Sequence, residues 1–116
     1  MIEATVTLVT SLVSRFPGLR GLLAKHIEGN SGEILPHVFF GDVTRYVIRC
    51  AGSGEASSEL HDILGYLEEA FVRGDRDVIE LVSVSFLENL PREGEAGAQV
   101  RQWLGPCLAK ELRGIG

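Results

Sequence analysis

The chain lacks the features that are typical of membrane, secreted and disulfide-rich proteins. No apolar run reaches 18 residues, so no membrane-spanning helix is expected. The N-terminal segment has no basic start and does not have the pattern of a secretory signal peptide. With only two cysteines, Cys50 and Cys107, we expect buried free thiols in a reducing compartment, the cytoplasm. The sequence leaves open whether the two form a disulfide.

Catalytic and metal-binding motifs are also missing. The chain has no phosphate-binding loop, no dinucleotide-binding glycine pattern, no serine-hydrolase elbow, and neither HExxH nor CxxC. His26, His37 and His61 lie on separate segments and, together with the two cysteines, lack the ligand spacing of a zinc site. We therefore expect no enzyme activity, no metal and no cofactor. A ligand-binding pocket near His37 and Arg45 is the lesser alternative.

Acidic charge is concentrated in the middle of the chain. The net charge is −5 over 116 residues, but residues 55–95 hold eleven acidic residues and three arginines, a net charge of −8. A surface of this sign repels phosphate, so we expect no nucleic-acid partner. It would attract a basic protein and accelerate the encounter with it. A solvated acidic face that keeps the chain soluble explains the same charge equally well.

The apolar residues predict an all-α fold. A chain of 116 residues, 45% of them hydrophobic, has the size and composition of one domain with a real core. Apolar positions recur at helical spacing in about six segments, so we predict a single-domain helical bundle over residues 1–116. The pairing of the helices also indicates a small helical-repeat stack, although no repeated motif is present. The predicted helices span residues 2–16, 19–27, 36–51 (continuous across Gly41 and ended by residues 52–54), 58–73, 75–90 and 100–112 (kinked at Pro106).

The stretch Asp75–Pro91 is predicted to be a buried central helix. Its apolar residues cover more than one helical face, which is typical of a helix surrounded by others. Gly74 can end the preceding helix, Asp75 or Asp77 can cap the new one, and Pro91 stops it. The alternation of Val82–Phe86 also fits a strand, but the caps and the length favour a helix. The short turn predicts an antiparallel hairpin with residues 58–73.

Two runs carry a family resemblance, LPHVFFGDVTRYV at 35–47 and LEEAFVRGDRDVIELVSVSFLENL at 67–90. Together they resemble a group of small, mostly helical bacterial proteins that look like immunity proteins of polymorphic toxin systems. The resemblance covers about a third of the chain. It implies a protein that binds and silences a cognate toxin domain, and it implies no catalytic residues.

The leading functional hypothesis is therefore a cytoplasmic inhibitor that binds its toxin stoichiometrically. Toxins that attack nucleic acids or nucleotides often have a basic cleft, which an acidic surface would cover. The alternative is a protein-interaction or homo-oligomeric scaffold domain without a toxin, such as a homodimer. The residues predicted to bind the partner are Glu68, Glu69, Asp75, Asp77, Glu80 and Glu88.

Overall fold

A computed structural model describes residues 3–52 and 58–115, and across these ranges it contains helices and no β-strand. This confirms the all-α prediction and shows that the alternating Val82–Phe86 stretch is not a strand. The predicted helix start at Ile2 and part of the predicted break at 52–54 lie outside the described residues. The α-helices are α1 (Ala4–Arg15), α2 (Arg20–Gly29), α3 (Pro36–Gly52), α4 (Ser58–Val72), α5 (Arg76–Ser85) and α6 (Pro106–Ile115), and the 3-10 helices are η1 (Pro17–Leu19), η2 (Leu87–Asn89) and η3 (Ala98–Trp103).

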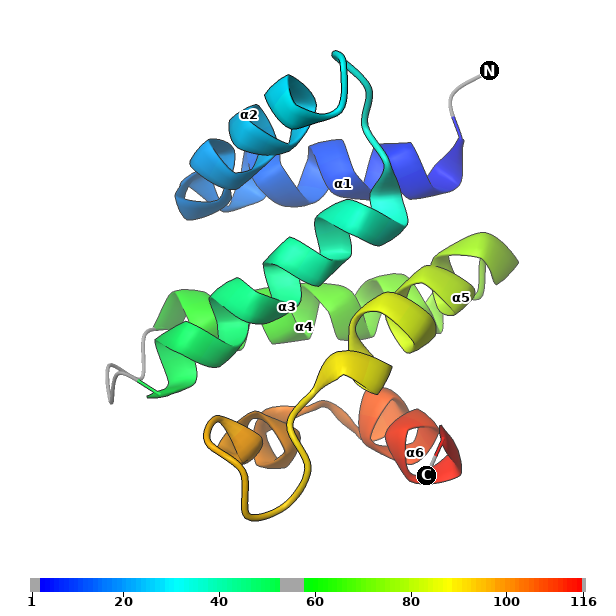
Figure 1. Ribbon diagram of the computed structural model, residues 1–116. Coiled ribbons are helices and arrows are strands. Elements are labelled where there is room, and N and C mark those ends of the chain that lie inside the picture. The colour runs from blue at the N-terminus through cyan, green and yellow to red at the C-terminus, as the bar shows by residue number, and fades with distance from the viewer. Residues whose placement is uncertain (1–2, 53–57, 116) are drawn as a thin grey trace.

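The helices stack in three levels, as Figure 1 shows. α1 and α2 form the top of the view, α3, α4 and α5 cross the middle, and η3 and α6 lie at the bottom. α3 packs against α1, α2, α5 and η3, and α5 packs against α1, α3 and α4. α3 and α5 therefore join the middle level to the top one, and α3 and α4 join it to η3 and α6 below, whereas the sequence predicted one central helix.

The core is built from one apolar face of each α-helix and the 3-10 turns. α3 contributes Phe39 and Phe40, which are fully buried and pack edge to face at 6.4 Å between ring centroids. Removing side chains of this size from water stabilises a fold by about 1.5–3 kcal/mol each. α3 is continuous across Gly41, as the sequence predicted. The fully buried large side chains are Phe39, Phe40, Phe86, Leu12, Leu19, Leu60, Ile63, Leu64, Leu67, Leu81, Leu87 and Leu108.

α5 begins as its sequence predicts. Gly74 has φ +82° and ends the preceding turn in the left-handed conformation that favours glycine. The Asp75 side chain then accepts hydrogen bonds from the amides of Asp77 (2.9 Å) and Val78 (3.1 Å). These two amides have no partner within the helix, so a capping carboxylate stabilises it. α4 and α5 pack together across this short connection, as the predicted hairpin requires.

The predicted end of the central helix at Leu90 is wrong, because α5 ends at Ser85 and is followed by η2. The backbone carbonyl of Ser85 accepts hydrogen bonds from Asn89 Nδ2 (2.9 Å) and Thr44 Oγ1 (3.0 Å). The last carbonyl groups of a helix have no partner within the helix. Thr44 lies on α3, so a residue that is distant in the sequence supplies a hydrogen bond to one of them. The helix is also less buried than predicted, since its outer face is exposed.

The predicted kink at Pro106 is a complete break. η3 ends at Trp103, Leu104 is extended (φ −69°, ψ 143°), and Pro106 is the first residue of α6. Proline suits the first position of a helix, where no amide hydrogen bond is lost, and it disfavours helix at the residue before it. The apolar spacing of residues 100–112 thus continues through two separate helices.

Candidate functional site

An acidic groove of about 710 Å³ opens where the N-terminal ends of α1, α3 and α5 meet. Four carboxylates and one imidazole line it, and no lysine or arginine does. The positive ends of three helix dipoles point toward this region and favour negative side chains there. We call this hollow the acidic groove; its lining residues are Glu3, Ala4, Thr5, Pro36, His37, Asp75, Asp77 and Glu80.

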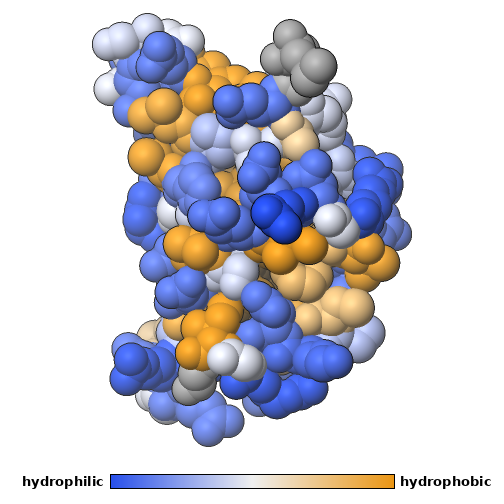
Figure 2. Space-filling view, turned by 90° about the vertical axis from the view of Figure 1, so that its right-hand side faces the viewer, coloured by the Kyte–Doolittle hydropathy of each residue, from blue (hydrophilic) through white to orange (hydrophobic). Residues whose placement is uncertain are grey.

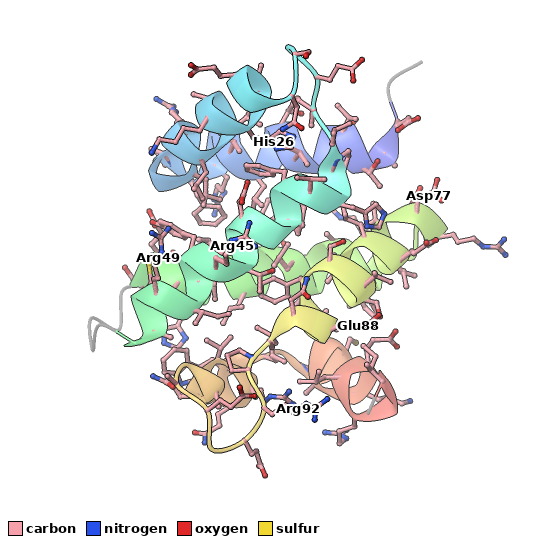
Figure 3. The ribbon with its side chains drawn as sticks, viewed as in Figure 1. His26, Arg45, Arg49, Asp77, Glu88 and Arg92 are labelled. Atoms are coloured by element: carbon pink, nitrogen blue, oxygen red, sulfur yellow. The ribbon has the colours of Figure 1, made fainter. Side chains whose placement is uncertain are left out.

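The structure brings three of the six predicted partner-binding residues together in this groove, namely Asp75, Asp77 and Glu80. Asp77 and Glu80 lie on the outer face of α5, which continues through Val84, a side chain that is 45% exposed. Glu88 follows in η2 and is also exposed. Figure 3 shows Asp77 at the outer end of α5 and Glu88 farther along the chain. We call Asp77, Glu80, Val84 and Glu88 the acidic stripe.

The carboxylates of the acidic stripe form no ion pair with any lysine or arginine that the structure describes. Among the residues that the structure describes, the sole ion pair joins Arg45 to Asp42 on α3. Asp75 differs from the stripe residues, because one of its oxygens caps α5. Figure 2, which looks onto the right-hand side of Figure 1, shows a mostly hydrophilic face with apolar residues between the polar ones. Unpaired carboxylates beside apolar surface form a suitable contact for a basic protein.

Two ionisable residues of the groove, Glu3 and His37, were not among the predicted partner-binding residues. Glu3 precedes α1 and His37 lies in the first turn of α3, so both are far from α5 in the sequence. The ring of His37 is held by a 2.6 Å hydrogen bond between its Nδ1 and the Ser85 hydroxyl. Only the packing of the three helices brings these residues together, and no local pattern indicates it. His37 and Arg45, which the sequence suggested as neighbours of one ligand pocket, line two different hollows.

Glu68 and Glu69 lie outside the acidic groove. The carboxylate of Glu68 accepts hydrogen bonds from the amides of Cys107 and Leu108, both at 2.9 Å. It therefore caps the N-terminus of α6 from the neighbouring helix α4. Because this contact occupies both oxygens of Glu68, we assign it to the fold and leave it out of the binding surface. Glu69 is exposed on α4.

The same carboxylate controls the thiol of Cys107. A hydrogen bond to Glu68, burial and the negative charge of Glu68 raise the pKa of Cys107 above that of an ordinary cysteine. Since the thiolate is the reactive form, we expect Glu68→Gln to move the pH profile of Cys107 alkylation by iodoacetamide to lower pH. Glu69→Gln is the matched control and should leave the profile in place.

A change in the maximal alkylation rate, with the midpoint of the pH profile unmoved, would mean that Glu68 only shields the thiol. Peptide mass spectrometry separates the modification of Cys107 from that of Cys50. The wild-type midpoint should lie above that of a free cysteine, since the raised pKa lowers the thiolate fraction at any given pH.

Within the described ranges, no three histidine, cysteine, aspartate or glutamate side chains are grouped to hold a metal ion. Over the same residues, none of the helices combines the length and apolar character needed to cross a bilayer.

Comparison with known proteins gives one match. A family model described as a domain of unknown function (DUF7674) matches residues 9–115. The match runs from α1 to the end of α6 and includes Pro36, His37, Asp75, Asp77 and Glu80 of the acidic groove. No curated protein and no solved structure matches the chain.

Proposed function

The chain belongs to the DUF7674 family, and we propose that it is a binding protein that holds a basic partner protein in the acidic groove. The observation that carries this proposal is a groove lined by Glu3, Asp77 and Glu80 with no lysine or arginine among its lining residues. Lysine or arginine side chains of a partner would form charge-assisted hydrogen bonds there, which are stronger than neutral ones.

The proposed partner is a cognate bacterial toxin, which the chain would neutralise by covering a basic cleft. The resemblance of residues 35–47 and 67–90 to immunity proteins supports this choice. These two runs supply five of the eight residues that line the acidic groove: Pro36, His37, Asp75, Asp77 and Glu80. The segments that carry the resemblance and the segments that form the groove are therefore largely the same.

The acidic stripe offers charged residues that can orient a partner and an apolar residue that the partner can bury. Asp77, Glu80 and Glu88 would steer a basic partner toward α5 and fix its orientation, an effect that falls as salt concentration rises. Val84 lies among these carboxylates and offers apolar surface that a partner can bury. Apolar contact would then supply affinity that remains at high salt.

We expect Asp77→Lys/Glu80→Lys to weaken binding of the partner at least about tenfold, equivalent to about 1.4 kcal/mol. The double change replaces two attractive charges with two repulsive ones. Partner proteins are first captured from source cells with the tagged chain and then expressed alone to test whether they kill. Titration calorimetry with a partner that kills gives the dissociation constant, and co-expression shows whether each variant still protects cells.

The control variant Glu28→Lys/Asp62→Lys makes the same charge change at two exposed residues outside the groove. It should bind like the wild type, apart from a small general charge effect. Equal affinities of the two double variants would show that the acidic groove is not the interface. A captured partner that binds through the groove but is harmless when expressed alone would favour the scaffold alternative over the immunity function.

A further inference from the structure

A second hollow, of about 340 Å³, lies between α2 and α3 and carries the opposite charge. Leu22 and Ile48 are partly buried and supply its apolar surface, and Arg45 and Arg49 are exposed at its rim. Arg45 pairs with Asp42, and among the described residues Arg49 has no acidic partner. We call these five residues the basic hollow.

The acidic stripe and the basic hollow are complementary in charge and in pattern. On the outer face of α5 and η2, the exposed Val84 lies between Glu80 and Glu88 in the sequence. On α3, Ile48 lies between Arg45 and Arg49. Each surface thus places an apolar side chain beside two charged ones of a single sign, and the signs are opposite. Such an arrangement favours association and fixes its register.

One copy of the chain does not join these two surfaces. Figure 3 shows Arg45 and Arg49 along the left half of α3, and Asp77 and Glu88 to the right of them, at α5 and η2. Neither arginine forms an ion pair with a carboxylate of the stripe. The complementary surfaces are therefore available to different molecules at the same time.

We propose that the basic hollow binds the acidic stripe of a second copy of this chain. Val84 of one copy packs over Leu22 and Ile48 of the other, and Glu80 pairs with Arg49. The contact joins two different surfaces, so it is head-to-tail, and it either repeats or closes into a ring. The inference rests on the proposed function, because the same stripe would bind the basic partner. Self-association then keeps the stripe covered until that partner displaces it.

Sedimentation velocity of the whole chain tests this contact. We expect the average mass of the wild type to rise with protein concentration at low salt and to return toward the monomer at high salt. Arg49→Glu and Glu80→Lys should each weaken the association at least about tenfold, because each puts two like charges into the contact. Arg113→Glu and Glu28→Lys make the same charge changes at exposed sites elsewhere and should associate like the wild type.

Mixing the two interface variants gives the decisive result. The Arg49→Glu chain keeps an intact stripe and the Glu80→Lys chain keeps an intact hollow. An equimolar mixture should therefore form a pair at concentrations where each variant alone is monomeric. A wild type that stays monomeric at every concentration would overturn the proposal. So would a mixture that fails to associate, or association that only one of the two variants weakens.

The same variants separate this inference from the proposed function. Arg49 lies outside the acidic groove, so Arg49→Glu should leave binding of the basic partner intact or strengthen it by removing the competing self-contact. Glu80→Lys should weaken both interactions. If self-association is absent while Asp77→Lys/Glu80→Lys loses the partner, the inference fails and the proposed function stands. If self-association follows the prediction but Asp77→Lys/Glu80→Lys binds the partner normally, the proposed function fails.

Discussion

Replacing Gly97 with alanine should destabilise the fold by about 3 kcal/mol. Gly97 has φ +87°, a conformation that costs a residue with a Cβ about 1–2 kcal/mol. The new Cβ would also lie 2.7 Å from Cγ2 of Ile48 and 3.4 Å from Cγ of Pro91. Overpacking of this kind typically costs about 1–3 kcal/mol. Urea unfolding followed by circular dichroism measures the change in the free energy of unfolding.

Gly94→Ala is the matched control, because Gly94 has nearly the same backbone conformation (φ +89°) with open space around its Cβ position. Gly94→Ala should lower the free energy of unfolding only by the cost of placing a Cβ at positive φ, about 1–2 kcal/mol. The difference between the two variants reports the overpacking at Gly97, most of which comes from the shorter approach to Ile48 on α3. Equal losses would show that η3 does not pack against Ile48 as closely as the structure indicates.

Gly105→Ala should destabilise the fold by about 2 kcal/mol by removing the cap of α6. A Cβ at this position would lie 2.5 Å from Cδ of Glu68, so the carboxylate must leave the amides of Cys107 and Leu108. Loss of a helix cap costs about 0.5–2 kcal/mol, and hydrogen bonds to a charged group are worth about 1.5–3 kcal/mol. Glu68→Ala should have a similar effect because it removes the same cap. Thermal and urea unfolding measure both losses.

A double-mutant cycle tests whether the two residues act through one contact. Once Glu68 is alanine, the Cβ at position 105 has room and no cap to displace. The double variant Glu68→Ala/Gly105→Ala should then be about as stable as Glu68→Ala alone. Additive losses would show that Gly105 is required for another reason, such as the backbone conformation before Pro106.

The helices could be predicted from the sequence because helical periodicity and most helix starts depend on residues that are close together in the chain. The start of α5 follows from Gly74 and Asp75, whose conformation and side chain act within three residues of the helix end. The ends of α5 and η3 did not follow in the same way. Thr44 reaches across from α3 to the carbonyl of Ser85, and such a contact leaves no periodic pattern in the sequence.

His26 illustrates the same limit of local sequence signals. In the sequence it is one of three scattered histidines, but in the fold its side chain is buried. Its Nε2 accepts a hydrogen bond from the Leu35 amide at 2.9 Å, and its backbone carbonyl accepts one from Asn30 Nδ2 at 2.7 Å. His26 thus fixes the connection from α2 to α3, which sets the position of His37 in the acidic groove.

The acidic surface was predicted in part. Charge counting identified the acidic middle of the chain, and the helical period places Asp77 and Glu80 on one face. These two signals could not distinguish Asp77 and Glu80 from Glu68, whose carboxylate caps a helix through an amide 39 residues later in the chain. Nor could they add Glu3, which the fold brings to the groove from the N-terminal segment. Charge in a sequence shows which residues are acidic, and only packing shows which of them remain unpaired.

The central claim is that the acidic groove holds the basic partner, and amide hydrogen exchange with and without the captured partner tests it most directly. The chain is kept at a concentration where it is monomeric. We predict that protection concentrates at the first turns of α1 and α3 and along α5, where the groove and the stripe lie, with α6 unchanged. Protection confined to α2, η3 or α6, with α5 exchanging as in the free chain, would contradict it.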